Sequence, residues 1–331
     1  MKASSIRQTG HGTDTGKKRR RNEDDYVVEP PLFAVADGMG GAQAGELASS
    51  LAAAAVREDE AELASGEDRV TELIQEANRR VYQRSSEDAA VSGMGTTMTV
   101  ALVEDGNVAF GHVGDSRAYL IRGGRLEQLT EDHSLVAELV RSGKLSPEEA
   151  EAHPQRSVIT RALGTDPNVD VDTFSIQTEP GDLFMLCSDG LTSMVDDDVI
   201  LETVEKHRDD LQTASKALIR AANKGGGEDN ITVIFFEIGE GTEEPLEETA
   251  QYPVVGDDQP QADDEDTLDE FDRVPAVETM VVPSEETDRL AEDAGPPAAK
   301  QRTRSRVLPA LVLILVALAV VAIVLWTLST R

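Results

Sequence analysis

Three aspartates stand at the edges of short apolar runs, and each lies beside glycine. Asp37 and Asp189 directly follow such runs and precede a glycine, and Asp229 stands between three glycines and a run that begins at Ile231. The runs predict buried strands, and glycine lets the backbone turn sharply where a strand ends. A lone Asp-Gly pair is usually only a turn. Three carboxylates at strand edges predict a β-scaffold that offers oxygen donors to a hard divalent cation.

Residues 1–239 alternate between strand and helix patterns, which predicts an α+β domain. Strands are expected at Tyr26–Val28, Leu32–Ala36, Thr97–Val103, Asn107–Val113, Arg117–Arg122, Leu183–Ser188 and Ile231–Ile238. Helices are expected at Glu46–Val56, Val70–Ser85, Leu135–Ser142, Val199–Glu205 and Thr213–Asn223. The pairs Asp105-Gly106 and Gly123-Gly124 favour hairpins and antiparallel sheets. We therefore expect two stacked sheets whose outer faces are covered by helices.

The chain has a net charge of −32, and acidic and basic residues are concentrated in different segments of the sequence. Residues 240–299 carry 20 acidic and two basic side chains, and residues 300–331 carry five basic and no acidic ones. The acidic segment has few aromatic residues and is predicted to be a disordered linker. No overall basic field favours nucleic acid as a partner. The single cysteine, Cys187, excludes an intramolecular disulfide and lies in an apolar run, so a buried and unreactive thiol is expected.

Residues 307–328 contain 22 positions without a charged side chain. At about 1.5 Å per residue, a helix of this length matches the hydrocarbon thickness of a bilayer. The basic segment 300–306 precedes it, so the positive-inside rule predicts a single span with residues 1–239 in the cytoplasm and 329–331 as a short outer tail. The absence of an apolar stretch at the N-terminus argues against a signal peptide.

Six segments carry the candidate chemistry, and their order and spacing resemble one family. They are Thr13–Asp24 with a run of five basic residues, Phe33–Gly41, Gly93–Thr97, Gly111–Arg117, Leu186–Leu191 and Gly227–Val233. Together they resemble the metal-dependent protein Ser/Thr phosphatases of the PP2C family in their bacterial form, over about residues 5–238. No single segment carries this resemblance. It implies an α-β-β-α sandwich of two antiparallel sheets with helices outside.

The resemblance also implies roles for particular residues. Asp37 would bridge two Mn²⁺ or Mg²⁺ ions, Gly38 would bind one of them through its carbonyl, and Asp189 and Asp229 would complete the other. Glu23, with Asp24 beside it, would lie near the ion at Gly38. Asp115 would hold a weaker third metal ion, and Arg19 would bind the substrate phosphate. The reaction implied is direct attack on phosphoserine or phosphothreonine by a hydroxide held between two ions, without a phosphoenzyme.

One position departs from the family pattern. Eukaryotic members often carry a histidine directly after the Asp-Gly pair, where this chain has Met39. His153 is a candidate proton donor, although an exposed or packing role is the stronger interpretation. It lies in residues 132–163, which resemble the mobile flap of bacterial members and are called the flap segment below. His112 is expected to be a sheet residue rather than a ligand.

Two further interpretations remain open at the sequence level. The first is a catalytically silent phosphatase fold that serves as a regulatory binding module; degenerate members usually lose metal aspartates, and all are present here. The second concerns the linker, which is either a simple tether or carries phosphorylated threonines such as Thr267 and Thr279 that recruit a reader. The expected partners are phosphoproteins, membrane Ser/Thr kinases and the lipid bilayer, with a monomeric catalytic domain.

Overall fold

The computed structural model describes residues 5–40, 44–58, 65–104, 106–240 and 280–281. All of these belong to one compact unit, which comprises residues 1–291. The predicted segments 300–306, 307–328 and 329–331 and most of the predicted linker lie outside the described residues. Within the described part, no helix is both long enough and apolar enough to cross a bilayer.

Two antiparallel sheets form the centre of the unit. The first has the order β1-β12-β11-β7-β8, with bounds β1 Ser5–Asp14, β12 Ile231–Gly239, β11 Leu183–Cys187, β7 Arg117–Arg122 and β8 Arg125–Gln128. The second has the order β10-β6-β5-β3-β2, and a short β4 pairs with β3. Its bounds are β10 Asp172–Gln177, β6 Asn107–Val113, β5 Met98–Glu104, β3 Leu32–Met39, β2 Asp24–Glu29 and β4 Gly95–Thr96.

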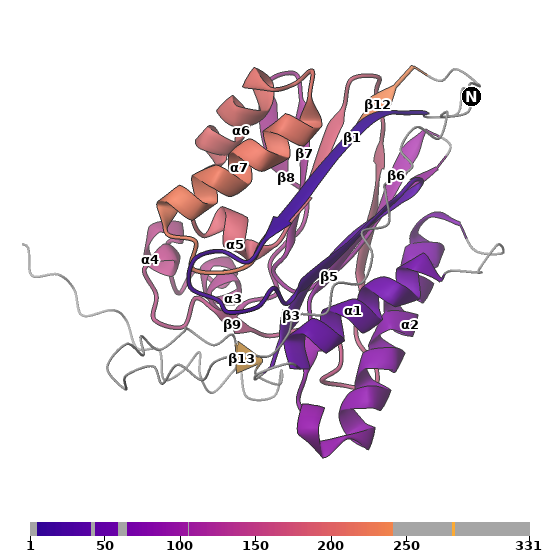
Figure 1. Ribbon diagram of the computed structural model, residues 1–331, viewed down its shortest axis with the longest axis vertical. Coiled ribbons are helices and arrows are strands. Elements are labelled where there is room, and N and C mark those ends of the chain that lie inside the picture. The colour runs from indigo at the N-terminus through magenta and orange to yellow at the C-terminus, as the bar shows by residue number, and fades with distance from the viewer. Residues whose placement is uncertain (1–4, 41–43, 59–64, 105, 241–279, 282–331) are drawn as a thin grey trace, which may run out of the picture. The chain divides into compact units, whose positions relative to one another are not determined.

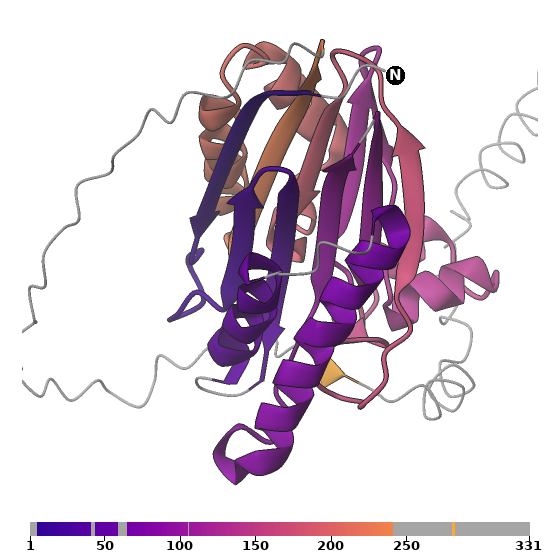
Figure 2. The same ribbon diagram turned by 90° about the vertical axis from the view of Figure 1, so that its right-hand side faces the viewer.

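Helices cover the outer faces of both sheets (Figures 1 and 2). The second sheet is covered by α1 (Ala44–Arg57) and α2 (Gly66–Glu87), and a 3₁₀ turn follows at Ala89–Val91. The first sheet is covered by α5 (Asp189–Thr192), α6 (Asp197–Lys206) and α7 (Leu211–Gly225). The flap segment contains α3 (Leu135–Arg141), α4 (Pro147–Glu151) and β9 (Val158–Ile159), and β9 pairs in parallel with β13 (Met280–Val281).

Three apolar layers hold these elements together, as the alternation along β3 illustrates. Phe33 and Val35 face the other sheet, where the Phe33 ring stacks on Phe236 with centroids 4.2 Å apart. Ala34 and Ala36 face the opposite way and pack in the cluster that contains the alanines of α1. Successive side chains of a strand point to opposite faces, so one short run serves two layers. A third layer joins α5, α6 and α7 to the first sheet.

The predicted sandwich of two antiparallel sheets flanked by helices is confirmed. All seven predicted strands and all five predicted helices are present, with ends that differ by a few residues. Several elements were not predicted: β1, β4, β8, β9, β10, β13, α4 and α5. The strands β8 and β10 are edge strands with half-exposed residues, so neither has a strong apolar pattern.

Candidate metal and phosphate site

Asp37 lies near the end of β3, opposite Asp24 of β2 in the antiparallel register. Its backbone is held firmly: Asp37 N donates to Thr97 Oγ1 at 3.0 Å, and Asp37 O accepts from Thr97 N at 2.9 Å and from Thr96 Oγ1 at 2.8 Å. The Gly-rich entry to β5 therefore serves to fix the backbone of Asp37. These bonds leave its carboxylate free to bind a ligand.

The other sheet supplies Asp189 and Asp229. Asp189 is the first residue of α5, directly after β11, and Asp229 precedes β12. The sheets are linked at this point, because Asp24 Oδ2 accepts from Ser188 Oγ at 2.8 Å and from Thr232 Oγ1 at 2.6 Å. The two sheets thus bring the three predicted aspartates, with Asp24, to one end of the sandwich.

Burial and mutual repulsion raise the pKa values of these carboxyls. Burial is the main cause for Asp37, whose pKa lies well above its usual range, and the neighbouring Asp24 and Asp189 add to it. Burial likewise raises the pKa of Asp24 to about 7. Burial also raises the pKa of Asp189, and repulsion from Asp115 and Asp229 adds to that shift. Such a cluster of buried acids is costly unless positive charge compensates it.

Glycines beside the aspartates are required by close backbone packing. A Cβ on Gly38 would lie 2.1 Å from the carbonyl oxygen of Gly45 in α1. A Cβ on Gly190 would lie 2.0 Å from the carbonyl oxygen of Asn230. Each Asp-Gly pair therefore marks a point where two backbones meet without room for a side chain.

Arg19 reaches the carboxylate cluster from the loop between β1 and β2. Its Nη2 lies 2.7 Å from Asp229 Oδ2, and its Nη1 lies 3.8 Å from Glu23 Oε2. Burial works against the charge of Arg19, but Asp229, Asp37 and Glu23 raise its pKa. Burial raises the pKa of Glu23, and Arg19 opposes that shift. The guanidinium is half-buried, and its planar fork suits an anionic phosphoryl group.

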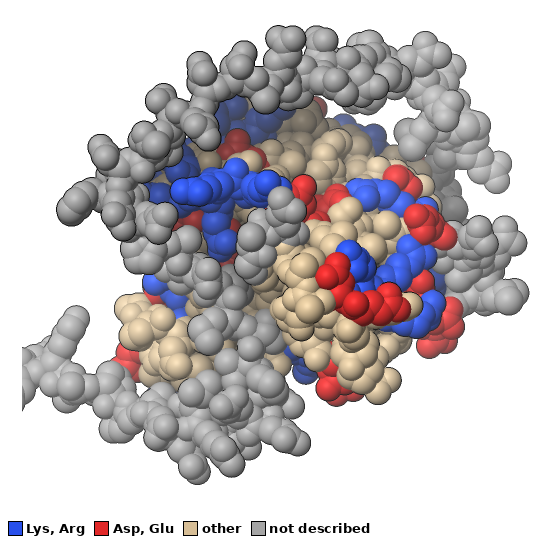
Figure 3. Space-filling model, turned by 60° about the horizontal axis from the view of Figure 1, so that its bottom comes forward, with Lys and Arg blue, Asp and Glu red and all other residues tan. Residues whose placement is uncertain are grey.

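The basic run around Arg19 lies at the surface. Lys17, Lys18, Arg20 and Arg21 are all exposed. Figure 3, in which the bottom of the molecule comes forward, shows a group of basic side chains on a face that otherwise mixes both signs. The rim of the site therefore offers positive charge to an anionic substrate.

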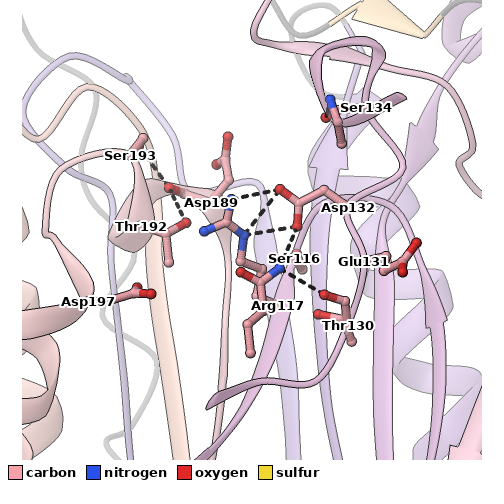
Figure 4. A network of polar contacts seen from close by, with 12 residues as sticks. Ser116, Arg117, Thr130, Glu131, Asp132, Ser134, Asp189, Thr192, Ser193 and Asp197 are labelled. Carbon is pink, nitrogen blue, oxygen red and sulfur yellow. Dashed lines mark hydrogen bonds and ion pairs between the residues drawn. The ribbon is translucent and has the colours of Figure 1, made fainter. Parts of the chain in front are cut away.

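Asp115 lies in the turn before β7 and is buried. Burial raises its pKa to about 7; Asp132 raises it further and Arg117 lowers it. Arg117 forms a bidentate salt bridge with Asp132, in which Nε donates to Oδ1 at 2.9 Å and Nη2 donates to Oδ2 at 2.7 Å. Figure 4 shows this guanidinium directed toward Asp132, with Asp189 at the neighbouring β11–α5 corner. The turn that carries Asp115 is thereby fastened to the first residue of the flap segment.

The other singled-out side chains have structural roles. His112 in β6 hydrogen-bonds to Thr99 Oγ1 at 2.9 Å, which confirms it as a sheet residue. Burial raises the pKa of Cys187 to about 12, as expected for an unreactive thiol. His153 Nδ1 accepts from Gln155 N at 3.2 Å within its own turn. No described contact joins His153 to the carboxylate cluster, so its role as proton donor stays a prediction.

The donor set fits hard divalent cations. All side-chain donors are oxygens, which suits Mg²⁺ and Mn²⁺. Two buried carboxylate oxygens, Asp24 Oδ1 and Asp189 Oδ1, have no hydrogen-bond partner. Across the described residues, no group of three or more acidic, histidine or cysteine side chains is placed so that it could hold a metal ion by itself.

A family model for protein phosphatase 2C matches residues 12–224, well over half of the chain. The chain belongs to the protein phosphatase 2C family. The serine/threonine phosphatase Stp of Listeria monocytogenes is 41% identical over 236 residues, which cover 68% of this chain and 93% of that protein. The serine/threonine protein phosphatase PstP of Mycobacterium tuberculosis is 38% identical over 228 residues, which cover 68% of this chain and 44% of PstP.

Solved structures agree with the assignment to the protein phosphatase 2C family. The crystal structure of the catalytic domain of the phosphatase PstP in complex with two manganese ions has a TM-score of 0.65 to this chain. It is 34% identical and covers 71% of this chain and 99% of that one.

Some site residues of this protein phosphatase 2C domain were not found by sequence reasoning. Asn230 Oδ1 accepts from Glu23 N at 2.7 Å, and its Nδ2 donates to the carbonyls of Thr15 and Arg21, both at 2.9 Å. One side chain therefore fixes the loop that carries Arg19. Its only signal in the sequence is its position next to Asp229.

Proposed function

We propose that this chain is a metal-dependent protein serine/threonine phosphatase that hydrolyses phosphoserine and phosphothreonine esters. The observation that carries the proposal is the cluster of buried carboxylates with Arg19 at its rim. Membership of the protein phosphatase 2C family supports it, as do its relatives Stp and PstP, which are named serine/threonine phosphatases. The manganese complex of a related catalytic domain supports Mn²⁺ or Mg²⁺ as the cofactor.

Two groups of residues have different proposed roles: one would hold the cations, and the other would orient the phosphate. Asp37, Asp189 and Asp229 would hold the cations, the carbonyl of Gly38 would add a donor, and Asp115 would serve a weaker third position. When bound, divalent ions neutralise a phosphoryl dianion and lower the pKa of a coordinated water from about 15.7 toward neutrality.

Arg19 would orient the phosphate, because its guanidinium is already directed at the cluster by Asp229 and Glu23. Glu23, with Asp24 beside it, would lie near the cation at Gly38. Met39 cannot donate a proton to the leaving oxygen, which leaves a solvent molecule or a flap residue such as His153 for that step.

A membrane location is part of the proposal. The 22 uncharged positions of residues 307–328, preceded by basic residues 300–306, support a bilayer span with the phosphatase domain on the cytoplasmic side. Such an anchor would hold the enzyme near membrane Ser/Thr kinases and their substrates and raise their effective concentration.

The test is phosphate release from a phosphothreonine peptide with Mn²⁺, comparing wild type with Asp37→Asn. We expect turnover in wild type and a loss of about 10²- to 10³-fold in the variant, because removing a group that stabilises transition-state charge has effects of this size. The metal-free variant should melt no lower than metal-free wild type, since it loses one of several mutually repelling buried charges. Asp209→Asn, an exposed aspartate, controls for net charge.

The competing function is a silent binding module. It predicts that wild type binds Mn²⁺ in calorimetry but releases no phosphate from any phosphopeptide. Folded wild-type protein that binds Mn²⁺ without turnover would therefore replace the phosphatase proposal with the module.

A further inference from the structure

The strand β9 of the flap segment has partners on both edges. Ser134 forms an antiparallel bridge to Ile159 on one edge. On the other, β13 pairs in parallel, with Met280 opposite Val158 and Val281 opposite Ile159. Figure 1 shows β13 and β9 together at the end of the sandwich where β3 ends. A segment within the acidic linker therefore extends a strand of the flap segment.

Packing ties β9 to the strand that carries Asp37. Ile159 is buried in a small cluster with Met39 and Ala162, and Met39 is the last residue of β3. Four residues after Ile159, Leu163 exchanges hydrogen bonds with Thr96 in both directions, at 2.9 and 3.2 Å. Thr96 is also the residue whose hydroxyl bonds to Asp37 O. A peptide chain added to β9 thus lies on an element packed directly against the site.

We propose that β9 is a docking strand for extended peptides, and that residues 280–281 are its intramolecular occupant, in competition with phosphoprotein substrates. Strand addition uses main-chain hydrogen bonds, which do not depend on the side chains of the added peptide. This inference rests on the proposed phosphatase function.

The shortness of the β9–β13 pairing suits a reversible occupant. A pairing of two residues makes few hydrogen bonds, so a substrate can displace it. Covalent attachment compensates, because tethered segments reach effective concentrations on the order of millimolar.

The decisive variant is full-length Met280→Pro/Val281→Pro. Proline has no backbone N–H and is poorly tolerated in a paired strand, so the variant disrupts the pairing of β13 with β9. We expect faster amide hydrogen exchange at Ile159, because the amides of Val158 and Thr160 donate instead to Gln155 O and His133 O. We also expect kcat/KM for a phosphothreonine peptide to rise about three- to tenfold, with no change for a small aryl phosphate that needs no docking strand. Ala262→Pro/Asp263→Pro, in the same linker, should match wild type in all three measurements.

Two results would overturn the proposal. Unchanged exchange at Ile159 in the variant would show that β13 does not occupy β9. Faster exchange with an unchanged kcat/KM for the phosphopeptide would show that the docked segment does not compete with substrate. If the chain releases no phosphate from either substrate, the proposed function fails, whereas the exchange measurement still decides whether β13 occupies β9.

Discussion

At the scale of single residues, Asn230 holds the loop that carries Arg19. Its amide donates to two carbonyls of the Arg19 loop and accepts from the backbone of Glu23. Asn230→Asp keeps the shape but places an acceptor against two carbonyls, and an unmade buried hydrogen bond costs about 1–3 kcal/mol. We expect KM for a phosphopeptide to rise about tenfold or more, with a smaller change in kcat. Equal KM values in variant and wild type would assign the positioning of Arg19 to other contacts.

His112 gives a second prediction, which concerns acid stability. Burial, with the neighbouring His133, lowers its pKa to about 3, compared with about 6.5 in the unfolded chain. The folded state then binds fewer protons, so this contribution to stability is complete above pH 6.5 and is lost as pH falls from 6.5 toward 3. Its Nε2 faces the carbonyl of Glu131 and its Nδ1 faces Thr99, so the ring is held neutral.

Urea unfolding at pH 7.0 and 5.5 measures this effect. Wild type should lose about 1.4 kcal/mol more than His112→Gln over this interval, because one pKa unit corresponds to about that free energy. Gln retains a donor toward the Glu131 carbonyl but does not titrate. Parallel losses in the two proteins would contradict the prediction. The comparison cancels the contribution of the buried aspartates, which both proteins share.

At the scale of elements, the flap segment is fastened to the Asp115 turn at two adjacent residues. Asp132 is held by Arg117, and His133 N donates to Gly114 O at 2.8 Å while His133 Nδ1 accepts from Gly114 N at 2.9 Å. Asp132→Asn weakens the first fastening and leaves a partly buried arginine without its charge partner, at a cost of about 2–3 kcal/mol.

We expect Asp132→Asn to speed hydrogen exchange across residues 131–141 and to raise the Mn²⁺ concentration needed for full activity. Asp182→Asn is the matched control, because Asp182 pairs with Arg122 at 2.5 Å at the other end of β7. It should lower thermal stability without changing the Mn²⁺ dependence. Identical Mn²⁺ dependence in both variants would show that the fastening does not act on the metal site.

Elements also show what the sequence could and could not predict. Residues 32–36 identify a strand by their own apolar run, and the Asp-Gly pair after them marks its end. In contrast, β1 is polar and contains glycines at positions set by distant contacts: a Cβ on Gly10 would lie 2.2 Å from the backbone of Leu211 in α7. Likewise, the bonds of Asp24 to Ser188 and Thr232 join residues far apart in the chain. Such contacts leave no periodic signal.

At the scale of the whole molecule, the proposed membrane span gives the last prediction. Leu315 lies near the middle of residues 307–328, and an arginine at the centre of a span costs about 2.5–3.5 kcal/mol on insertion scales. Leu315→Arg should therefore move the protein from the membrane to the soluble fraction of cell lysates while its phosphatase activity in detergent is preserved. Leu268→Arg makes the same substitution in the acidic linker and should leave the protein in the membrane. Recovery of the wild-type protein in the soluble fraction would contradict the proposed membrane anchor. The enzyme would then reach kinase substrates by diffusion alone.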